Sequence, residues 1–274
     1  MREMKFTKMV ASGNDFVVTE VKGQNSKIKG LNVLAKNICH RKYGIGADGL
    51  LVLEQSKKAD IRMRIFNADG SEAEMCGNGA RCTALFVGSR CKKIETKAGI
   101  IETKVNKDIV KIKLTEPKNT KLNIPLQVNN RNIKVNFINT GVPHTVIFTE
   151  GLKKIDIVSL GRQIRYHHKF APSGTNVDFV EVLDNNSIGL RTYERGVEDE
   201  TLACGTGSVA SALIFASLRP SSVIRHPSSV IHQVNVLTQS GETLKVYFER
   251  RENNYKNVWL EGRARIVYKG VYNV

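Results

Sequence analysis

Two cysteines of this 274-residue chain stand in the same local sequence, which suggests that they share a chemistry. The segment 76–80, Cys-Gly-Asn-Gly-Ala, returns at 204–208 as Cys-Gly-Thr-Gly-Ser, and an apolar, small-residue run that predicts a buried helix follows each copy. Glycines let the backbone turn sharply and approach a ligand closely. A helix that begins there offers unpaired N–H groups and a partial positive charge, which can bind a carboxylate and favour a thiolate. Each motif therefore predicts an anion-binding turn beside a reactive sulfur.

The repeat extends upstream of both cysteines. Ser-Gly-Asn-Asp-Phe-Val-Val at 12–18 resembles Thr-Gly-Val-Pro-His-Thr-Val at 140–146, and these segments place Asn14 62 residues before Cys76 and His144 60 residues before Cys204. The strand-like runs that begin at Asp48 and Asp178 lie 28 and 26 residues before the cysteines. Three features in one order at similar spacing predict two related halves, and ligand sites commonly lie between such halves. We therefore expect the two cysteines to face each other across a cleft.

The other cysteines, Cys39, Cys82 and Cys91, lack flanking glycines and are interpreted as small buried hydrophobes. Five cysteines, an odd number, argue against a disulfide framework, and the absence of a Cys-x-x-Cys pair argues against a structural zinc site. No stretch approaches the roughly 18 apolar residues of a membrane span, and the N-terminal segment lacks a signal-peptide pattern. We expect a cytoplasmic protein.

Several other functions fit the sequence less well. Segments 44–49 and 205–210 match the dinucleotide fingerprint, but the first leads into a strand and the second lacks the acidic residue expected about 20 residues later. The net charge of +16 is compatible with nucleic-acid binding, yet the basic residues are scattered and not interleaved with aromatic residues. Attraction of a substrate with several carboxylates is a milder interpretation of the charge. A cysteine hydrolase would leave the second cysteine unexplained.

A set of polar side chains accompanies the two motifs. A lone asparagine beside a glycine usually indicates a turn. As a set, amides with one arginine and one glutamate can bind an amino-acid head group, since arginine binds carboxylates and the oxygens bind ammonium. The set comprises Asn14, Asn67, Asn78, Asn176, Glu194 and Arg195.

These motifs together resemble the diaminopimelate epimerase family. The matching segments are 8–16, 44–49, 66–82, 143–144, 175–177, 194–196 and 200–207, in the order that the family has them. The resemblance implies an α+β fold of two pseudo-symmetric domains, each a curled, mostly antiparallel, barrel-like sheet around a central helix. The implied domains are 1–117, completed by the C-terminal strand 264–274, and 118–263.

The resemblance also implies the reaction. Family members interconvert LL- and meso-2,6-diaminopimelate in lysine and peptidoglycan-precursor biosynthesis, without pyridoxal phosphate, metal or another cofactor. They are usually homodimers, and no nucleic-acid or membrane partner is expected. One thiolate removes the α-proton and the opposite thiol returns a proton to the other face, with Cys204 as base and Cys76 as acid from LL to meso. Because the α-proton is very weakly acidic, the carbanion needs electrostatic stabilisation.

The resemblance assigns roles to single residues. The N–H groups of Gly77, Asn78, Gly205 and Thr206 would hold the α-carboxylate. Asn67, Asn176, Glu194 and Arg195 would bind the distal end, while His144 and Glu194 would modulate the pKa values of the thiols. The chain departs from the family at two positions, because Gly49 replaces a substrate-contacting Gln of some members and Val142 an Asn of many. A racemase of another amino acid on the same scaffold is therefore the alternative.

Overall fold

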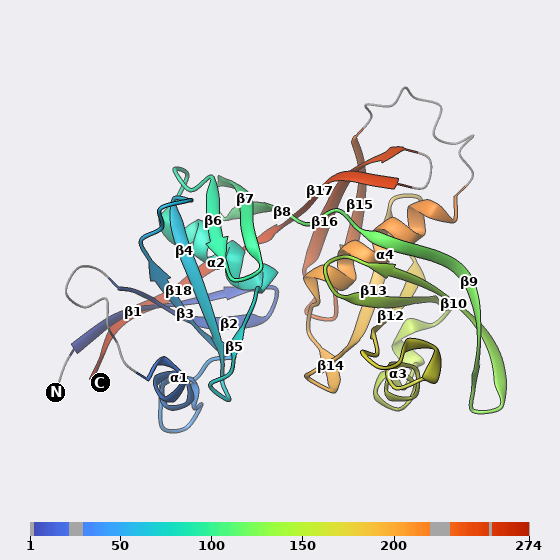
Figure 1. Ribbon diagram of the computed structural model, residues 1–274, viewed down its shortest axis with the longest axis horizontal. Helices are drawn as coiled ribbons and strands as arrows, with labels where there is room; N and C mark the ends of the chain where they lie inside the picture. Colours follow the sequence, from blue (N-terminus) through green and yellow to red (C-terminus); the bar gives the residue numbers. More distant parts are fainter. Residues whose placement is uncertain (1–2, 22–29, 220–230, 252–253, 274) are drawn as a thin grey trace. The chain divides into compact units, whose positions relative to one another are not determined.

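The computed structural model describes residues 3–21, 30–219, 231–251 and 254–273. The chain divides into two compact units. In Figure 1 the first contains the blue to green segments together with the red C-terminal strand, and the second contains the green to orange-red segments. Unit 1 comprises Met1–Lys113 and Gly262–Val274, and unit 2 comprises Leu114–Glu261. No helix in the described residues combines the length and the apolar character that a membrane crossing requires.

Unit 1 is a mostly antiparallel sheet with two helices. Its elements are β1 (Glu3–Ala11), β2 (Asn14–Glu20), α1 (Leu31–Cys39), β3 (Gly49–Glu54), β4 (Ile61–Asn67), β5 (Glu72–Ala73), α2 (Gly77–Val87), β6 (Lys93–Thr96), β7 (Gly99–Asn106), β8 (Ile109–Lys113) and β18 (Arg265–Asn273). The pairs β18–β1, β1–β2, β3–β4, β4–β5, β6–β7 and β7–β8 are antiparallel. The pairs β2–β3 and β4–β6 are parallel.

Unit 2 repeats this topology. Its elements are β9 (Lys118–Val128), β10 (Arg131–Asn139), β11 (Pro143–Phe148), η2 (Leu152–Lys154), α3 (Ile157–Arg165), η3 (His168–Phe170), β12 (Asn176–Val182), β13 (Ser187–Glu194), β14 (Asp199–Thr201), α4 (Gly205–Ser217), β15 (Ile231–Leu237), β16 (Thr243–Arg251) and β17 (Asn254–Arg263). Again two pairs, β11–β12 and β13–β15, are parallel, and β9–β10, β10–β11, β12–β13, β13–β14, β15–β16 and β16–β17 are antiparallel. Two sheet-dominated units of one topology confirm the predicted α+β class.

In each unit one helix packs on each face of the sheet, and the central strands are therefore buried on both sides. Alternate residues of a strand point to opposite faces. In β3, Leu50 and Val52 pack with α1, whereas Leu51 approaches Gly79 of α2. The contacts of α2 with strands β1, β2, β3, β4, β7, β8 and β18 make it the central helix of unit 1 (Figure 1).

The same arrangement holds α4 in unit 2. Val177 and Phe179 of β12 pack with Ile157 and Ile164 of α3 on one face. The opposite face meets α4, which also contacts β10, β11, β13, β15 and β16. Nearly every residue of α4 is buried, as its apolar, small-residue sequence predicts.

The sheet registers identify which positions correspond in the two units. Gly49 is the first residue of β3 that pairs with β2, and Asn176 is the first residue of β12 that pairs with β11. Two residues further along each strand, Asp178 therefore corresponds to Leu51. The correspondence of Asp48 with Asp178 in the sequence repeat is wrong by three residues, because a similar apolar run does not fix strand register.

Candidate active site

Cys76 is the N-cap residue of α2, so the predicted helix start is confirmed. Its backbone is extended, with φ −142° and ψ 123°, and its sulfur accepts a hydrogen bond from the N–H of Gly79 at 3.5 Å. The sulfur also lies 3.9 Å from Oδ1 of Asn14, which begins β2. We call Cys76, Asn14, Asn78 and the N-terminus of α2 half-site 1.

A charged cluster fixes Asn14 beside this sulfur. The amide Nδ2 of Asn14 donates to Asp48 at 2.7 Å, and Arg41 binds Asp48 at 2.7 Å and Asp15 at 2.9 Å. Lys8 also pairs with Asp15 at 2.8 Å. Burial opposes ionisation of Asp15, but the hydrogen bonds from Arg41 and Lys8 outweigh it and lower the pKa of Asp15 below its usual range. Because Nδ2 is held by a carboxylate, Oδ1 of Asn14 is the atom that points to Cys76.

Arg81 lies next to half-site 1 and was not predicted as a site residue. Its side chain is completely buried, and Nη2 donates to Oδ1 of Asn78 at 2.7 Å and to Oγ of Ser12 at 2.9 Å. An arginine inside a run of small and apolar helix residues was the available signal. Asn67, by contrast, is exposed at the end of β4, where its amide donates to Ser71 at 3.0 Å.

Cys204 is the N-cap residue of α4, which confirms the second predicted helix start. Its sulfur accepts a hydrogen bond from the N–H of Gly207 at 3.4 Å and lies 3.5 Å from Oγ1 of Thr206. We call Cys204, Thr206, His144, Glu194 and Asp178 half-site 2.

A continuous chain of hydrogen bonds runs from this sulfur into the protein. Thr206 Oγ1 lies 3.0 Å from Nε2 of His144, whose Nδ1 lies 2.7 Å from Asp178. Thr192 donates to the other oxygen of Asp178 at 2.8 Å. A neutral His144 would donate from Nδ1 to the carboxylate and accept from Thr206 at Nε2, which leaves the Thr206 oxygen able to accept from the Cys204 thiol. Neither Asp178 nor Thr192 was predicted as a site residue.

Glu194 supplies a second acceptor next to Cys204. Its carboxyl is hydrogen-bonded by Thr201 at 2.6 Å and by the Cys204 thiol. Burial raises the pKa of Glu194 in spite of these hydrogen bonds. Burial also raises the pKa of Cys204 well above its ordinary value, and the charges of Glu194 and Asp178 raise it further. The expectation that the helix N-terminus makes Cys204 a thiolate is therefore wrong for the free protein, because desolvation outweighs the hydrogen bonds from Thr206 and Gly207.

Asn176 and Arg195 lie together in unit 2. The amide oxygen of Asn176 accepts from the backbone N–H of Arg195 at 2.9 Å, and its Nδ2 donates to the carbonyl of Pro143 at 2.9 Å. The Arg195 guanidinium donates to the carbonyl of Ser173 at 3.2 Å. Asn176 thus fixes the backbone that carries Arg195.

The four predicted backbone donors occupy the first turns of the two central helices. Gly77 and Asn78 open α2, and Gly205 and Thr206 open α4. The first N–H groups of a helix have no carbonyl partner within it, so both turns can accept an anion. Among the described residues, no group of three or more histidine, cysteine or acidic side chains is arranged to hold a metal ion.

Two glycines show how closely the backbone is packed here. A Cβ at Gly207 would stand 2.5 Å from Oδ1 of Asp178, so the carboxylate reaches the first turn of α4 only because this residue is glycine. A Cβ at Gly49 would stand 2.9 Å from the carbonyl oxygen of Phe66. A glutamine at position 49 would therefore need a shift of β4 in this chain. The close approach of β4 explains why residue 49 is a glycine.

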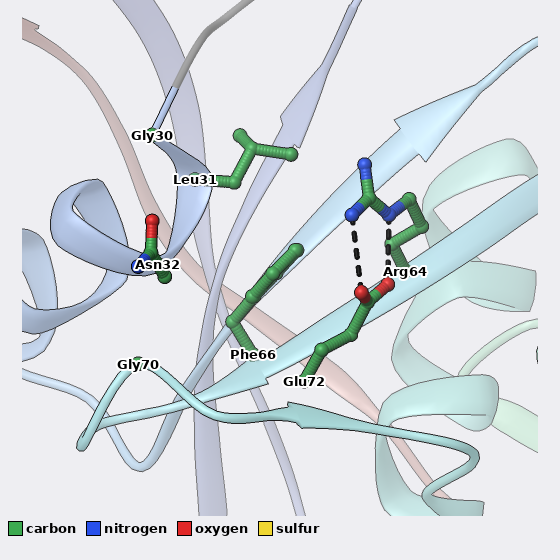
Figure 2. Close-up of a pocket in the computed structure, with 7 residues that line it drawn as sticks. All are labelled: Gly30, Leu31, Asn32, Arg64, Phe66, Gly70 and Glu72. Carbon is green, nitrogen blue, oxygen red and sulfur yellow. Dashed lines mark hydrogen bonds and ion pairs between the residues drawn. The ribbon is translucent and has the colours of Figure 1, made fainter.

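A cavity of about 360 Å³ lies elsewhere in unit 1 (Figure 2). Arg64 and Glu72 form two hydrogen bonds across it, at 2.8 and 3.1 Å, beside Phe66 and the segment 30–32 at the start of α1. None of its lining residues belongs to either half-site. Because Arg64 and Glu72 satisfy each other, we assign it no ligand.

Comparisons with known proteins identify the family of this chain. The family model described as diaminopimelate epimerase matches residues 6–120 and 136–265. The diaminopimelate epimerase of Aquifex aeolicus is 40% identical over 283 residues, which cover 97% of each chain. That of Methanocella arvoryzae is 39% identical over 291 residues, which cover 100% of this chain and 98% of the relative.

Solved structures show the same fold at low identity. A phenazine biosynthesis protein of the PhzF family from Bacillus anthracis aligns over both whole chains with a TM-score of 0.74 and 19% identity. A probable proline racemase from Agrobacterium radiobacter K84 aligns over 99% of this chain and 92% of its own length, with a TM-score of 0.67 and 15% identity.

Proposed function

The chain belongs to the diaminopimelate epimerase family, and from this premise we propose that it interconverts LL- and meso-2,6-diaminopimelate by a two-base mechanism at Cys76 and Cys204. The observation that carries the proposal is that each cysteine is the N-cap of a central helix in one of two units with the same topology. Placement of the two half-sites on opposite faces of one substrate, across a cleft, stays a prediction.

The proposed reaction is a proton exchange at one α-carbon. The α-carboxylate binds the N–H groups of Gly77, Asn78, Gly205 and Thr206, where two helix dipoles stabilise negative charge. A thiolate takes the α-proton as the C–H electron pair moves onto the α-carbon and carboxylate. The opposite thiol then gives its proton to the other face. The products are the inverted amino acid and a protein whose thiol and thiolate have exchanged places.

Half-site 2 contains acceptors for the proton of Cys204. For Cys204 to act as base it must first become a thiolate, although burial favours its neutral form. Glu194 accepts a hydrogen bond from the thiol, and Thr206 links the thiol to His144. These contacts support the assignment of His144 and Glu194 as groups that modulate the thiol. Asp178 would hold the His144 ring in the tautomer that can accept a proton.

The distal amino-acid end of the substrate provides specificity in this proposal. Arg195 would bind the distal carboxylate, while Asn67, Asn176 and Glu194 would complete the pocket. The direct contact of Asn176 with the Arg195 backbone supports joint action of these two residues.

The biological setting follows from the family and stays a proposal here. The reaction belongs to lysine and peptidoglycan-precursor biosynthesis, and we propose that the protein acts in the cytoplasm. We also propose a homodimer. Strand β18 supports it, because Ile266, Val267, Tyr268 and Val271 are 45–57% exposed, and large apolar side chains left exposed together on one strand can mark a protein contact.

Deuterium exchange tests the proposed reaction. LL-diaminopimelate in D₂O should yield meso product with one deuterium at the inverted α-carbon, measured by mass spectrometry and chiral chromatography. Cys76→Ala and Cys204→Ala should each reduce turnover by at least about 10³-fold, whereas Cys91→Ala, a buried control outside both half-sites, should retain it. Near-normal turnover in either active-site variant would rule out two-base catalysis.

The same assay separates the racemase alternative. The departures at Gly49 and Val142 motivate it. If histidine, proline or another α-amino acid exchanges faster than diaminopimelate, the chain uses the same chemistry on a different substrate.

A further inference from the structure

The turn 195–198 between strands β13 and β14 carries Arg195 and is closed by one carboxylate. Glu198 accepts a hydrogen bond from the backbone N–H of Gly196 at 3.0 Å, and its own N–H donates to the carbonyl of Glu194 at 2.8 Å. Glu198 has a φ of 59°, a left-handed conformation that a residue other than glycine keeps only where its surroundings hold it. The position of the turn therefore depends on what holds the Glu198 side chain.

Arg165 holds this side chain from helix α3. Its Nε and Nη2 lie 3.2 and 3.1 Å from Oε1 of Glu198, and the hydroxyl of Tyr193 donates to the other carboxylate oxygen at 3.3 Å. Only 13% of the Arg165 side chain is exposed, so solvent screens the ion pair less than it would screen a surface pair. Burial opposes ionisation of Glu198, but the hydrogen bond from Gly196 and the charge of Arg165 outweigh it and lower the pKa of this carboxyl. Glu198 is therefore an anion bound by Arg165 and by the turn itself.

The carbonyl of Ser173 brings Arg165 and Arg195 together. It accepts from Nη1 of Arg165 at 3.5 Å and from Nη1 of Arg195 at 3.2 Å. A Cβ at Gly174, whose φ is 64°, would collide with Nη1 of Arg165, so this approach requires a glycine. The two guanidinium groups thus share one acceptor on the chain that precedes β12.

The two arginines differ in their charge partners. Arg165 pairs with Glu198, whereas Arg195 donates to a neutral carbonyl and forms no ion pair with an acidic side chain of the described residues. Glu198 belongs to the same turn as Arg195, and opposite charges attract strongly over such short separations. Without Arg165, the Glu198 carboxylate would be drawn toward the Arg195 guanidinium and would compete with an incoming anion.

We propose that Arg165 is a positioning residue for Arg195, which holds the Glu198 carboxylate on Gly196, fixes the turn, and so leaves the charge of Arg195 for a carboxylate of the substrate. The inference deepens the proposed function, on which the role of Arg195 at the distal carboxylate rests. A group that binds the non-reacting end of a substrate stabilises the bound substrate and the transition state alike. Its loss therefore raises KM and leaves kcat unchanged.

The test compares KM and kcat for LL-diaminopimelate among variants of the full chain. In Arg165→Met we expect KM to rise about tenfold while kcat changes less than about threefold. Adding Glu198→Gln should bring KM partway back, because the amide can still accept from Gly196 but no longer attracts Arg195. A purely structural role predicts a further loss in the double variant instead. Arg162→Met, the same substitution at an exposed position of α3, is the control and should keep both constants.

Hydrogen–deuterium exchange separates this inference from the proposed function, because it needs no substrate. In Arg165→Met the peptide that contains residues 194–199 should exchange about tenfold faster than in the unmodified protein, and in Arg162→Met at an unchanged rate. If the unmodified chain does not epimerise diaminopimelate, the proposed function fails, and the exchange rates still decide whether Arg165 fixes the turn.

A second variant covers the case that Arg165→Met does not fold. Glu198→Ala changes a partly exposed side chain of the turn, and we expect it to raise KM and speed exchange as well. An unchanged KM in an active variant, a fall in kcat alone, a further loss in the double variant, or unchanged exchange in a folded variant would overturn the inference.

Discussion

The two half-sites share a backbone plan but differ in the side chains that surround it. In each unit, three equivalent strand positions face the first turn of the central helix. In unit 1 they hold Phe16, Leu51 and Ile65, and in unit 2 they hold His144, Asp178 and Thr192. On the central helices the charged residue belongs to unit 1. Helix α2 has the buried cation Arg81 at the position where α4 has Val209.

This difference teaches that a duplicated fold can surround two similar cysteines with different chemical environments. Half-site 1 has an apolar floor, and the buried cation Arg81 lies on its helix. In half-site 2, burial and the charges of Glu194 and Asp178 raise the pKa of the Cys204 thiol well above its ordinary value. One thiolate and one thiol are what a two-base exchange requires at the start of each turnover.

The largest effect is expected from removing the charge of Asp178. Asp178→Asn should lower kcat by about 100-fold in the direction in which Cys204 is the base, because His144 loses the partner that fixes its tautomer. Initial rates in both directions measure this. Thr192→Val, which removes a hydrogen bond but keeps the carboxylate, should cost only a few-fold. Equal rates for Asp178→Asn and the unmodified protein would show that the hydrogen-bond chain from Cys204 through Thr206 and His144 to Asp178 has no part in the mechanism.

A pair of glycine substitutions tests the packing difference between the helix ends. Gly207→Ala would set a Cβ 2.5 Å from Asp178, whose oxygens are fixed by Thr192 and His144, so we expect a loss of about 1–3 kcal/mol in unfolding free energy. Gly79→Ala meets Leu51 at 3.1 Å, a flexible side chain, and should cost less than about 1 kcal/mol. Urea denaturation compares the two. A larger loss for Gly79→Ala would contradict the packing described here.

The smallest effect concerns the pH dependence of stability. Because burial raises the pKa of Glu194 in the folded state, the native protein binds more protons than the unfolded chain between the ordinary glutamate pKa and this raised value. The contribution of Glu194 to the free energy of unfolding is therefore present at acidic pH, and it is lost as the pH rises through that window. Relative to Glu194→Gln, the unmodified protein should lose unfolding free energy as the pH rises from 4 to 8. Parallel stability curves for the two proteins would show that Glu194 does not titrate as argued.

Sequence patterns predicted the parts of the site that depend on local structure. The duplicated Cys-Gly-x-Gly motif placed Cys76 and Cys204 at helix starts, because caps and glycine turns are encoded within a few residues. The roles of Asp178 and Thr192 depend on strand register. The alignment of the two halves by sequence misplaced Asp178 by three residues. Arg81 contacts Asn78 and the turn at Ser12, and spacing alone does not reveal these contacts.

The protonation state of Cys204 was also beyond the sequence. A helix N-terminus lowers the pKa of a nearby thiol in water, but burial reverses the sign of the shift at Cys204, and burial is a property of the folded unit. At Cys204 the local sequence favours a lower thiol pKa and the folded environment raises it. Such conflicts often occur at functional positions.

The central claim, that both half-sites act on one diaminopimelate molecule, is tested most directly by ligand protection. The alkylation rates of Cys76 and Cys204 would be measured in one sample while meso-diaminopimelate is titrated at a fixed pH. If one substrate molecule occupies both half-sites, the two cysteines are protected with the same half-saturating concentration, and Cys91 in the same digest is unaffected. Protection of only one cysteine, or of the two at different concentrations, would contradict the account.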